Sequence, residues 1–343
     1  MSGELLLDVR DLAVQFPTAD GIVNAVSGLS FTLSRGETLG IVGESGSGKS
    51  VTNLAILGLL NSKRSLITGE ILLHGKDLLK ATPVELRDVR GKDVAMIFQD
   101  PFACLHPMYR VGDQIAEAVR AHLDVSKATA RDRAVEVLDA VGIPNARARS
   151  RDYPHQFSGG MRQRAMIAMA LSCNPDILIA DEPTTALDVT IQAQILELLD
   201  RLRADFDSAV ILITHDLGVV AEVADEILVM YAGRIVERGS KRNVFYDPQH
   251  PYTWGLLGSI PRLDRPKPKK LHSIEGTPPS LINLPQGCKF RPRCPHAFEK
   301  CFEEPELKNR VEDKGHLDRC WLSVDEKRGV RDSTIAGEER VVA

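Results

Sequence analysis

The residues with the clearest chemical potential form a glycine-rich stretch near the N-terminus. It comprises Gly43, Glu44, Ser45, Gly46, Ser47, Gly48, Lys49 and Ser50, with Val51 directly after it. Glycines let successive backbone N–H groups turn inward around an anion, Lys49 supplies a positive charge, and Ser50 offers an oxygen to Mg²⁺. This spacing is typical of a loop that binds nucleotide phosphates. The alternative is a glycine-rich turn without a ligand.

Two acids form the second candidate group. Asp181 and Glu182 end the apolar run that begins at Ile177. Together with a phosphate-binding loop, Asp181 is a candidate Mg²⁺ partner and Glu182 a candidate base that polarises an attacking water. The alternative interpretation makes the pair a helix cap after a buried strand.

A third stretch, FSGGMRQR, contains Ser158, Gly159, Gly160 and Met161 and precedes a helical pattern. Its hydroxyl and backbone N–H groups are suited to an anion. Ser-Gly-Gly turns are common in folded proteins, so on its own this stretch favours an ordinary turn.

The elements that would position these residues begin with strands. Residues 5–18 and 29–34 alternate apolar and polar positions, which predicts antiparallel strands. The continuous apolar run 38–42 predicts a buried parallel strand that leads into the glycine-rich loop. Helical periodicity over 49–60 then predicts a helix directly after the loop.

The middle of the chain predicts an α/β fold. Residues 112–142 have a helical pattern, which indicates a helical insertion over about 100–170. Apolar strands at 177–181 and 209–214 alternate with a helical stretch at 189–206. The expected fold class is therefore α/β, a P-loop NTPase with a mostly parallel sheet, an antiparallel β subdomain and a helical insertion.

Composition limits the class of protein. Among 343 residues, 43% are hydrophobic and 26% charged, which excludes disordered and fibrous classes. The net charge of -4, from 43 basic and 47 acidic residues, argues against nucleic acid as a partner. No apolar run approaches the ~20 residues of a membrane helix, and the N-terminus lacks a signal-peptide pattern. We therefore expect a cytosolic chain that docks on a membrane protein.

With these motifs in order, the sequence resembles the ATP-binding-cassette (ABC) ATPase family over residues 5–258. That family combines a phosphate loop, a glutamine, a Ser-Gly-Gly signature, an acidic strand end and a histidine. The glutamine matches Gln99 in AMIFQDP, the histidine matches His215 in ILITHD, and the D-loop matches Ala186, Leu187 and Asp188. Many members have Gln where Met161 stands here.

The resemblance implies roles for these residues. Two such subunits close head to tail, so that each ATP lies between one phosphate loop and the partner's signature. Gln99 is implied as a Mg²⁺ ligand, His215 as the group that senses the γ-phosphate and orients water, and Asp188 as part of the nucleotide site. Phe16 lies where the family stacks an aromatic ring on adenine, although an alternating strand also needs core aromatics.

The cysteines predict a further site. Cys288, Cys294, Cys301 and Cys320 lie within 33 residues, separated by five, six and eighteen residues, in a proline-interrupted segment. Four thiolates suit Zn²⁺ or an iron-sulfur cluster, and the absence of paired Cys-x2-Cys knuckles favours a [4Fe–4S] cluster over zinc. Free thiols are the remaining alternative.

The same segment, with HPYT before it, resembles the C-terminal region of the peptide-importer branch, which comprises oligopeptide, dipeptide and nickel uptake ATPases. We therefore expect an ABC domain over 1–258 and a C-terminal region over 259–343. The implied partners are a second homologous ATPase, two transmembrane permeases and an extracytoplasmic peptide-binding protein, at the cytoplasmic face of the cell membrane.

Two rival interpretations predict features that this sequence lacks. A soluble ABC ATPase that acts on DNA or ribosomes would have a long coiled-coil insertion or tandem cassettes, and neither is visible. A redox or nucleic-acid module built on the cysteines would interleave aromatic and basic residues around them. Lys289, Phe290, Arg291 and Arg293 give only a trace of that pattern.

Overall fold

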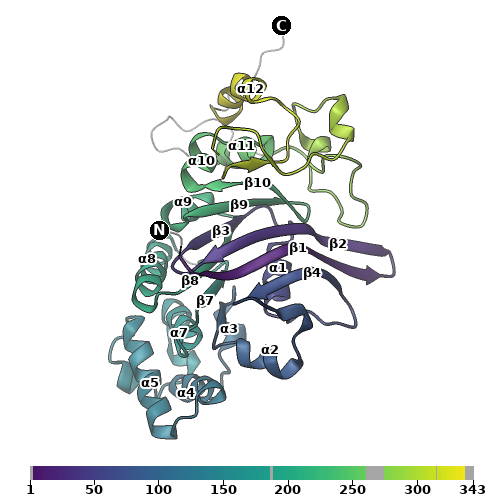
Figure 1. Cartoon of the computed structure of the whole chain (residues 1–343). Coiled ribbons are helices and arrows are strands. Elements are labelled where there is room, and N and C mark those ends of the chain that lie inside the picture. Colours follow the sequence, from purple (N-terminus) through teal and green to yellow (C-terminus); the bar gives the residue numbers. More distant parts are fainter. Residues whose placement is uncertain (1–2, 186–187, 260–273, 314, 337–343) are drawn as a thin grey trace.

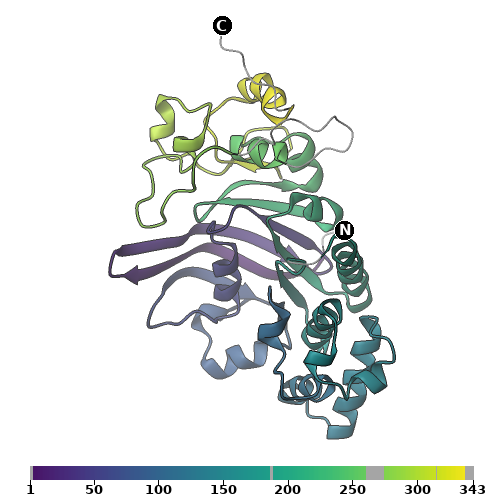
Figure 2. The same cartoon turned by 180° about the vertical axis from the view of Figure 1, so that it is seen from behind.

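The structure, a computed structural model, describes residues 3–185, 188–259, 274–313 and 315–336. The two sheets pack on each other in the middle of the molecule, the helical subdomain lies at one end, and the C-terminal region lies at the opposite end (Figure 1). The view from behind shows the same arrangement, with the long strands of the antiparallel sheet projecting to one side (Figure 2).

An antiparallel sheet contains the N-terminal strands. Its order is β2 (Gly21–Ser34), β1 (Leu5–Thr18), β4 (Leu66–Leu73) and β5 (Lys76–Asp77). Alternate side chains of β1, such as Leu7 and Val9, are buried in a core shared with Leu39 and Ile41 of the second sheet. The strand predictions for 5–18 and 29–34 are confirmed, and the second strand begins earlier than expected, at Gly21.

The second sheet carries the parallel strands. Its order among the described residues is β11 (Lys308–Asn309), β12 (Leu317–Asp318), β10 (Arg234–Ser240), β9 (Glu226–Tyr231), β3 (Thr38–Val42), β8 (Ala209–Thr214), β7 (Ile177–Asp181) and β6 (Val94–Ile97). Strand β3 is parallel to β8 and β9, and β7 is parallel to β6 and β8. Every residue of β3, β7 and β8 is buried, as continuous apolar strands in a parallel sheet require. Their carboxyl ends meet at one edge, where ligands bind in open α/β sheets.

Helices surround this sheet. In chain order they are α1 (Lys49–Ile56), α2 (Pro83–Val89), α3 (Pro101–Cys104), α4 (Val111–His122), α5 (Lys127–Ala140), α6 (Ala146–Arg149), α7 (Gly159–Leu171), α8 (Val189–Phe206), α9 (Leu217–Val223), α10 (Lys241–Tyr246), α11 (Pro251–Gly258) and α12 (Val324–Ala336). Short 3-10 helices occupy Leu78–Lys80, Pro154–Gln156, Arg291–Arg293 and Glu299–Phe302. The helical subdomain consists of α3 to α7, and its apolar side chains form one core with β6, β8 and α8.

Local signals explain where two predicted helical stretches end. Helix α1 stops at Ile56, earlier than the expected residue 60, because Gly58 has φ +58° and the N–H groups of Gly58 and Leu59 bond back to Ala55 and Leu54. This pairing is a Schellman motif. The stretch 112–142 contains two helices, because Ser126 caps the second by accepting a hydrogen bond from the N–H of Thr129.

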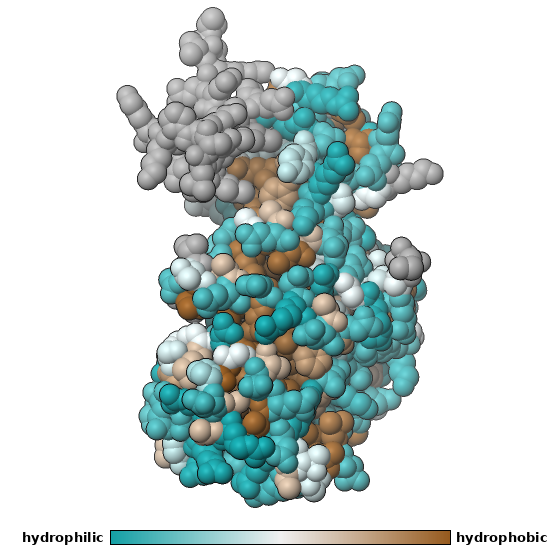
Figure 3. Space-filling model, turned by 90° about the vertical axis from the view of Figure 1, so that its left-hand side faces the viewer, coloured by the Kyte–Doolittle hydropathy of each residue, from teal (hydrophilic) through white to brown (hydrophobic). Residues whose placement is uncertain are grey.

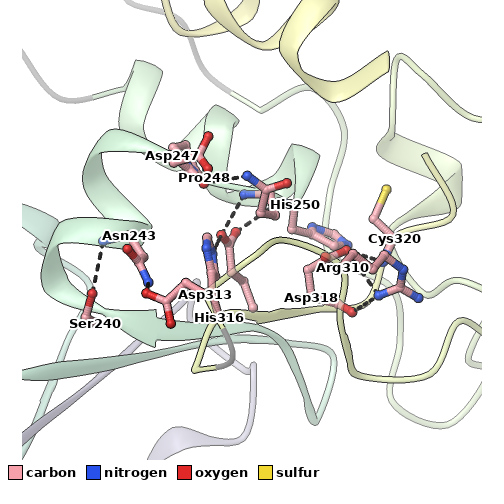
Figure 4. A network of polar contacts seen from close by, with 12 residues as sticks. Ser240, Asn243, Asp247, Pro248, His250, Arg310, Asp313, His316, Asp318 and Cys320 are labelled. Carbon is pink, nitrogen blue, oxygen red and sulfur yellow. Dashed lines mark hydrogen bonds and ion pairs between the residues drawn. The ribbon is translucent and has the colours of Figure 1, made fainter. Parts of the chain in front are cut away.

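The C-terminal region extends the main sheet. Strand β12 pairs with β10, and Glu237 of β10 is opposite Asp318 of β12. The fully buried Glu237 carboxylate accepts hydrogen bonds from the backbone N–H groups of Gln249 (2.6 Å) and His250 (2.9 Å) and contacts Nε2 of His316 at 2.8 Å. The polar contacts that join β10, α10 and the segment around Asp313–Cys320 lie together in Figure 4.

A buried ion pair fixes the end of this region. Asp318 lies 2.9 Å from the Lys327 ammonium of α12 and also contacts Arg310. Burial raises the pKa of Asp318, and the positive charge of Lys327 opposes that effect. Helix α12 is therefore held to the sheet by charges buried with their partners, as buried charges require.

The surface carries scattered apolar patches. On the side that forms the left-hand edge of Figure 1, hydrophobic residues gather in several patches among hydrophilic ones (Figure 3). None of the helices in the described ranges combines the length and apolar character that a bilayer crossing requires.

We predict that Glu237→Ala lowers the stability of the chain by about 3 kcal/mol, because it leaves His316 and two backbone N–H groups buried without their acceptor. Urea unfolding of the purified chain measures this change. Glu226→Ala is the matched control, since Glu226 pairs with Arg238 in a partly exposed site on the adjacent strand and should cost only about 0–1 kcal/mol. Equal losses in the two variants would contradict the assignment of Glu237 as the residue that anchors the C-terminal region.

Candidate functional site

The glycine-rich loop connects β3 to α1 at the carboxyl edge of the main sheet. Gly43 has φ +153°, and a Cβ there would lie 2.2 Å from the carbonyl oxygen of Met230. Gly48 has φ +103°, and its Cβ would lie 2.4 Å from the carbonyl oxygen of Ala25. Only glycine fits these two positions, so the loop has the tight backbone that a phosphate cradle requires.

The Lys49 side chain lies inside this loop. Its Nζ donates hydrogen bonds to the carbonyl oxygens of Gly43 (2.7 Å) and Glu44 (2.9 Å) and lies 3.4 Å from Oγ of Ser47. The residue is only 5% exposed. Burial lowers the pKa of Lys49, and the charges of Glu182, Asp181 and Glu44 oppose that shift. The ammonium is therefore positioned to pair with phosphate oxygens.

Two oxygens beside the loop suit a magnesium ion. Oγ of Ser50 at the start of α1 donates to Oδ1 of Asp181 at the end of β7, at 3.2 Å. Burial raises the pKa of Asp181, and the hydrogen bond from Ser50 opposes this shift. A hydroxyl and a carboxylate in contact are oxygen ligands of the type that Mg²⁺ prefers, so the residues fit a Mg²⁺ ion bound with nucleotide phosphates. Such an ion would neutralise charge on the phosphate oxygens.

The Glu182 carboxylate contacts two other predicted residues, Gln99 and His215. Its Oε2 accepts hydrogen bonds from Nε2 of Gln99 (3.0 Å) and Oγ1 of Thr185 (2.9 Å), and its Oε1 lies 3.3 Å from Nδ1 of His215. The backbone of Glu182 has φ +48°, a left-handed conformation that is strained for a non-glycine residue. Such strain is common at catalytic positions. The carboxylate is thus held between the glutamine and the histidine next to the phosphate loop.

The signature residues lie elsewhere. Ser158 caps α7 by accepting a hydrogen bond from the N–H of Met161, and Ser158 and Gly159 are exposed. Among the described residues, no hydrogen bond or ion pair connects this stretch to the phosphate loop of the same chain. Gln163, one turn further on, donates to the carbonyl oxygen of Pro183 and so joins α7 to the loop that follows Glu182.

The remaining predicted site residues have structural contacts that do not by themselves show a nucleotide-binding role. Phe16 is half-buried and packs on the core of the antiparallel sheet, and Val51 packs on the same core from α1, so neither contact decides between a nucleotide and a packing role. Asp188 is exposed and caps α8 by accepting from the N–H of Ile191. Ala186 and Leu187 lie outside the described residues.

Three contacts were not anticipated from the sequence. Thr185 bonds to Glu182, the Tyr252 hydroxyl accepts a hydrogen bond from the N–H of Glu44 at 2.8 Å, and Arg293 forms an ion pair with the Glu44 carboxylate. In the sequence, Tyr252 lies in HPYT and Arg293 lies in the cysteine-containing segment, and both stretches indicate only a resemblance to the peptide-importer branch. No local pattern could connect them to a glutamate that lies 208 positions before Tyr252 and 249 positions before Arg293.

The four clustered cysteines line one small pocket, together with His250, Phe290 and Trp321. Burial raises the pKa of Cys294 and of Cys320 to about 12 and also raises the pKa of Cys288. Within the described part of the chain, no three side chains of His, Cys, Asp or Glu form a group able to hold a metal ion. The expected iron-sulfur site is therefore not supported as a formed metal centre.

The phosphate loop, the acidic strand end, the glutamine and the histidine define a P-loop ATPase of the ABC type. Family models agree: the one described as ABC transporter matches residues 26–185, and the one described as the oligopeptide/dipeptide transporter C-terminal region matches residues 236–301. The chain belongs to the ATP-binding proteins of the ABC transporter family that carry this C-terminal region.

Individual relatives support this assignment along most of the chain. The oligopeptide transport ATP-binding protein OppD of Salmonella typhimurium is 54% identical over 322 residues, which cover 94% of this chain and 95% of that protein. The dipeptide transport ATP-binding protein DppD of Bacillus subtilis is 53% identical over 320 residues, with 93% and 95% covered. A bacterial ABC transporter cassette, solved as a dimer, is 26% identical with a TM-score of 0.62, covering 69% of this chain and 99% of that one.

We predict that Glu182→Gln keeps ATP binding but lowers turnover at least about 100-fold, because the amide cannot take a proton from the attacking water. Steady-state ATP hydrolysis by the assembled transporter and the binding of a fluorescent ATP analogue measure the two effects. Thr185→Val serves as the control, since it removes one hydrogen bond to Glu182 but leaves its carboxylate. Hydrolysis at the wild-type rate in Glu182→Gln would rule out this role for Glu182.

Proposed function

We propose that this chain hydrolyses ATP to energise the import of oligopeptides or dipeptides, as a peripheral subunit at the cytoplasmic face of the cell membrane. The observation that carries the ATPase proposal is the convergence of Gln99, Glu182 and His215 beside the Lys49 loop. The peptide substrate is supported by the names of the relatives and by the C-terminal family match.

In the proposed reaction, the backbone of the phosphate loop and Lys49 hold the β- and γ-phosphates, and Ser50 with Asp181 provides oxygens for Mg²⁺. Glu182 accepts a proton from the water that attacks the γ-phosphate. Gln99 and His215 hold that carboxylate in place, and the exposed His215 ring can also reach the γ-phosphate side of the site.

The nucleotide site is proposed to be completed by a second subunit. Ser158 and Gly159 offer an exposed hydroxyl and a helix N-terminus that do not face their own phosphate loop, an arrangement suited to a phosphate bound by a partner. We propose a homologous but distinct ATPase as that partner, with two permeases and an extracytoplasmic binding protein completing the transporter.

A reconstituted transporter tests the proposed substrate. Wild-type complex in proteoliposomes, with ATP supplied on the side of this chain, should accumulate labelled di- or oligopeptides, and peptide should stimulate ATP hydrolysis. The alternative substrates are nickel or another small solute. Stimulation and uptake with nickel but not with peptides would replace the peptide proposal while leaving the ATPase assignment intact.

For the proposed pairing, we predict that Ser158→Arg leaves ATP binding by the isolated chain unchanged but lowers hydrolysis by the assembled transporter at least about tenfold, because it removes an anion-binding helix end from the closed site. Ser126→Arg is the matched control, since Ser126 is an exposed cap of α5 in the same subdomain. Loss of ATP binding by the isolated Ser158→Arg chain would argue that the signature acts within its own chain.

The cysteine pocket is proposed to hold a [4Fe–4S] cluster. Backbone N–H groups of Phe290 and Arg291 favour the thiolate of Cys288, and that of His296 favours the thiolate of Cys294, by lowering their pKa values against the effect of burial. All four cysteines line this one pocket. The spacings of five, six and eighteen residues, without paired Cys-x2-Cys knuckles, favour a cluster over a zinc ion.

We predict that the wild-type chain purified without oxygen contains iron and sulfide rather than zinc, and that Cys294→Ser loses the metal and destabilises the C-terminal region. Iron, sulfide and zinc analysis, with thermal melting, measures both effects. Cys173→Ser is the control, because Cys173 lies in the helical subdomain, away from the pocket. Wild-type metal content and melting in Cys294→Ser would remove any role for the pocket.

For the domain organisation, we propose an ATP-binding domain over residues 1–258 and a cysteine-containing region over 259–343. The pairing of β12 with β10 makes the second region an extension of the sheet of the first. We therefore expect the region over 259–343 to depend on the cassette for its folding.

A further inference from the structure

One residue of the phosphate loop is held from outside the loop. The Glu44 carboxylate accepts two hydrogen bonds from Arg293, from Nη1 to Oε2 (2.6 Å) and from Nη2 to Oε1 (3.0 Å). Such paired, charge-assisted hydrogen bonds are among the strongest in proteins and fix both partners in one orientation. The Arg293 side chain is only 4% exposed, so water screens the pair weakly.

Arg293 is itself fixed by the C-terminal region. Its Nε donates to the carbonyl oxygen of Glu275 (2.9 Å), and its Nη2 donates to the carbonyl oxygen of Ile274 (3.2 Å). Burial alone would lower the pKa of Arg293. The hydrogen bonds that its guanidinium makes with Glu44 and Tyr231 outweigh this effect, so the pKa of Arg293 is raised. The guanidinium is therefore a permanent cation whose position is set by residues 274–275, outside the cassette sheet.

The backbone of Glu44 is held from the same side. Its N–H donates to the hydroxyl of the fully buried Tyr252, whose ring packs against Tyr231 and Phe290. The carbonyl oxygen of Glu44 in turn accepts the hydrogen bond from Lys49. A displacement of Glu44 would thus also move the carbonyl oxygen that accepts a hydrogen bond from Lys49, the residue proposed to bind phosphate.

The same region connects directly to the cysteine pocket. Arg293 ends the 3-10 helix Arg291–Arg293, and Cys294 follows it. Phe290, which packs on Tyr252, lines the pocket. On the opposite side, the carbonyl oxygen of Leu281 accepts a hydrogen bond from the N–H of Asn24 in the β1–β2 hairpin. The C-terminal region therefore touches both the phosphate loop and the strand pair that carries Phe16.

We propose that Arg293 is a positioning residue for ATP: it holds Glu44, and through it the phosphate loop, in the shape that binds ATP, and so makes nucleotide affinity depend on the folded C-terminal region. This inference rests on the proposed ATPase function. The alternative is that the Arg293–Glu44 pair only attaches the C-terminal region to the cassette, with no effect on the loop.

The two roles differ in what they change. A positioning role predicts a weaker Kd and a higher KM for ATP, with a smaller change in kcat at saturating ATP, because the loop contacts phosphate before and during the reaction. It also predicts reciprocity, since any coupling by which the C-terminal region strengthens ATP binding must let ATP stabilise that region by the same factor. A purely attaching pair predicts lower melting temperature alone.

The experiment uses the assembled transporter with Arg293→Met, Glu44→Gln and the double variant. We expect each single variant to raise Kd and KM for ATP about 5–10-fold, within the range of known coupling between sites, with kcat changed less than about twofold. The double variant should be no weaker than the weaker single variant, because both changes remove one shared interaction. Additive losses, or a Kd within twofold of wild type in both single variants, would overturn the proposal.

Arg291→Met is the matched control. Arg291 lies in the same 3-10 helix and lines the cysteine pocket, but its guanidinium stacks on Phe302, 3.7 Å from the ring centroid, rather than bonding to the loop. Its Kd for ATP should match wild type. If Arg291→Met weakens ATP binding as much as Arg293→Met, general loosening of the region explains the effect and the proposal is wrong.

Amide hydrogen exchange over residues 274–293 provides a readout that does not depend on hydrolysis. In wild type and Arg291→Met, ATP with Mg²⁺ should slow exchange in this segment, and in Arg293→Met it should not. Should Arg293→Met fail to fold, Glu44→Gln supplies the same comparison, because it leaves the C-terminal region intact. If wild type hydrolyses ATP but shows no ATP-dependent protection, this inference fails alone; if wild type neither binds nor hydrolyses ATP, the proposed function fails.

Discussion

The burial of the Lys49 ammonium is the constraint on which the site depends. A buried cation needs nearby acceptors and negative charge, and the loop carbonyls of Gly43 and Glu44, with Asp181 beyond them, supply both. These groups meet only because β3 and β7 run parallel and end at the same edge, separated by β8. The apolar packing of β3, β7 and β8 fixes where these strands end, and it thereby places the Lys49 ammonium beside the proposed phosphate site.

The C-terminal region is a short, proline-rich segment with too few apolar residues to form a hydrophobic core of its own. It uses the cassette as its core: β12 adds to β10, and Glu237 of β10 contacts His316 of the C-terminal region. Buried polar and charged contacts contribute little net stability but make wrong arrangements costly. The result is a region whose position relative to the sheet is well specified, and through Arg293 and Tyr252 relative to the phosphate loop as well.

Sequence patterns predicted the parts of the fold and site that rest on local signals. The continuous apolar runs identified β3, β7 and β8, and the spacing from Gly43 to Ser50 identified the phosphate loop, because both depend on neighbouring residues. The C-terminal end of α1 and the contact of Arg293 with Glu44 were not predictable in the same way. The first depends on one left-handed glycine, and the second joins residues that only the folded sheet brings together.

The strained backbone of Glu182 connects these observations. Its left-handed φ is tolerated because the N–H of Glu182 bonds to Ile213 of β8 while its carboxylate is held by Gln99, Thr185 and His215. Gln99 follows β6 and precedes the helical subdomain, so a movement of that subdomain changes a hydrogen bond to the proposed base. Glu44, on the other side of the loop, is held by the C-terminal region. The nucleotide site is therefore bounded on one side by the segment that leads into the helical subdomain and on the other by the C-terminal region, which lie at opposite ends of the molecule.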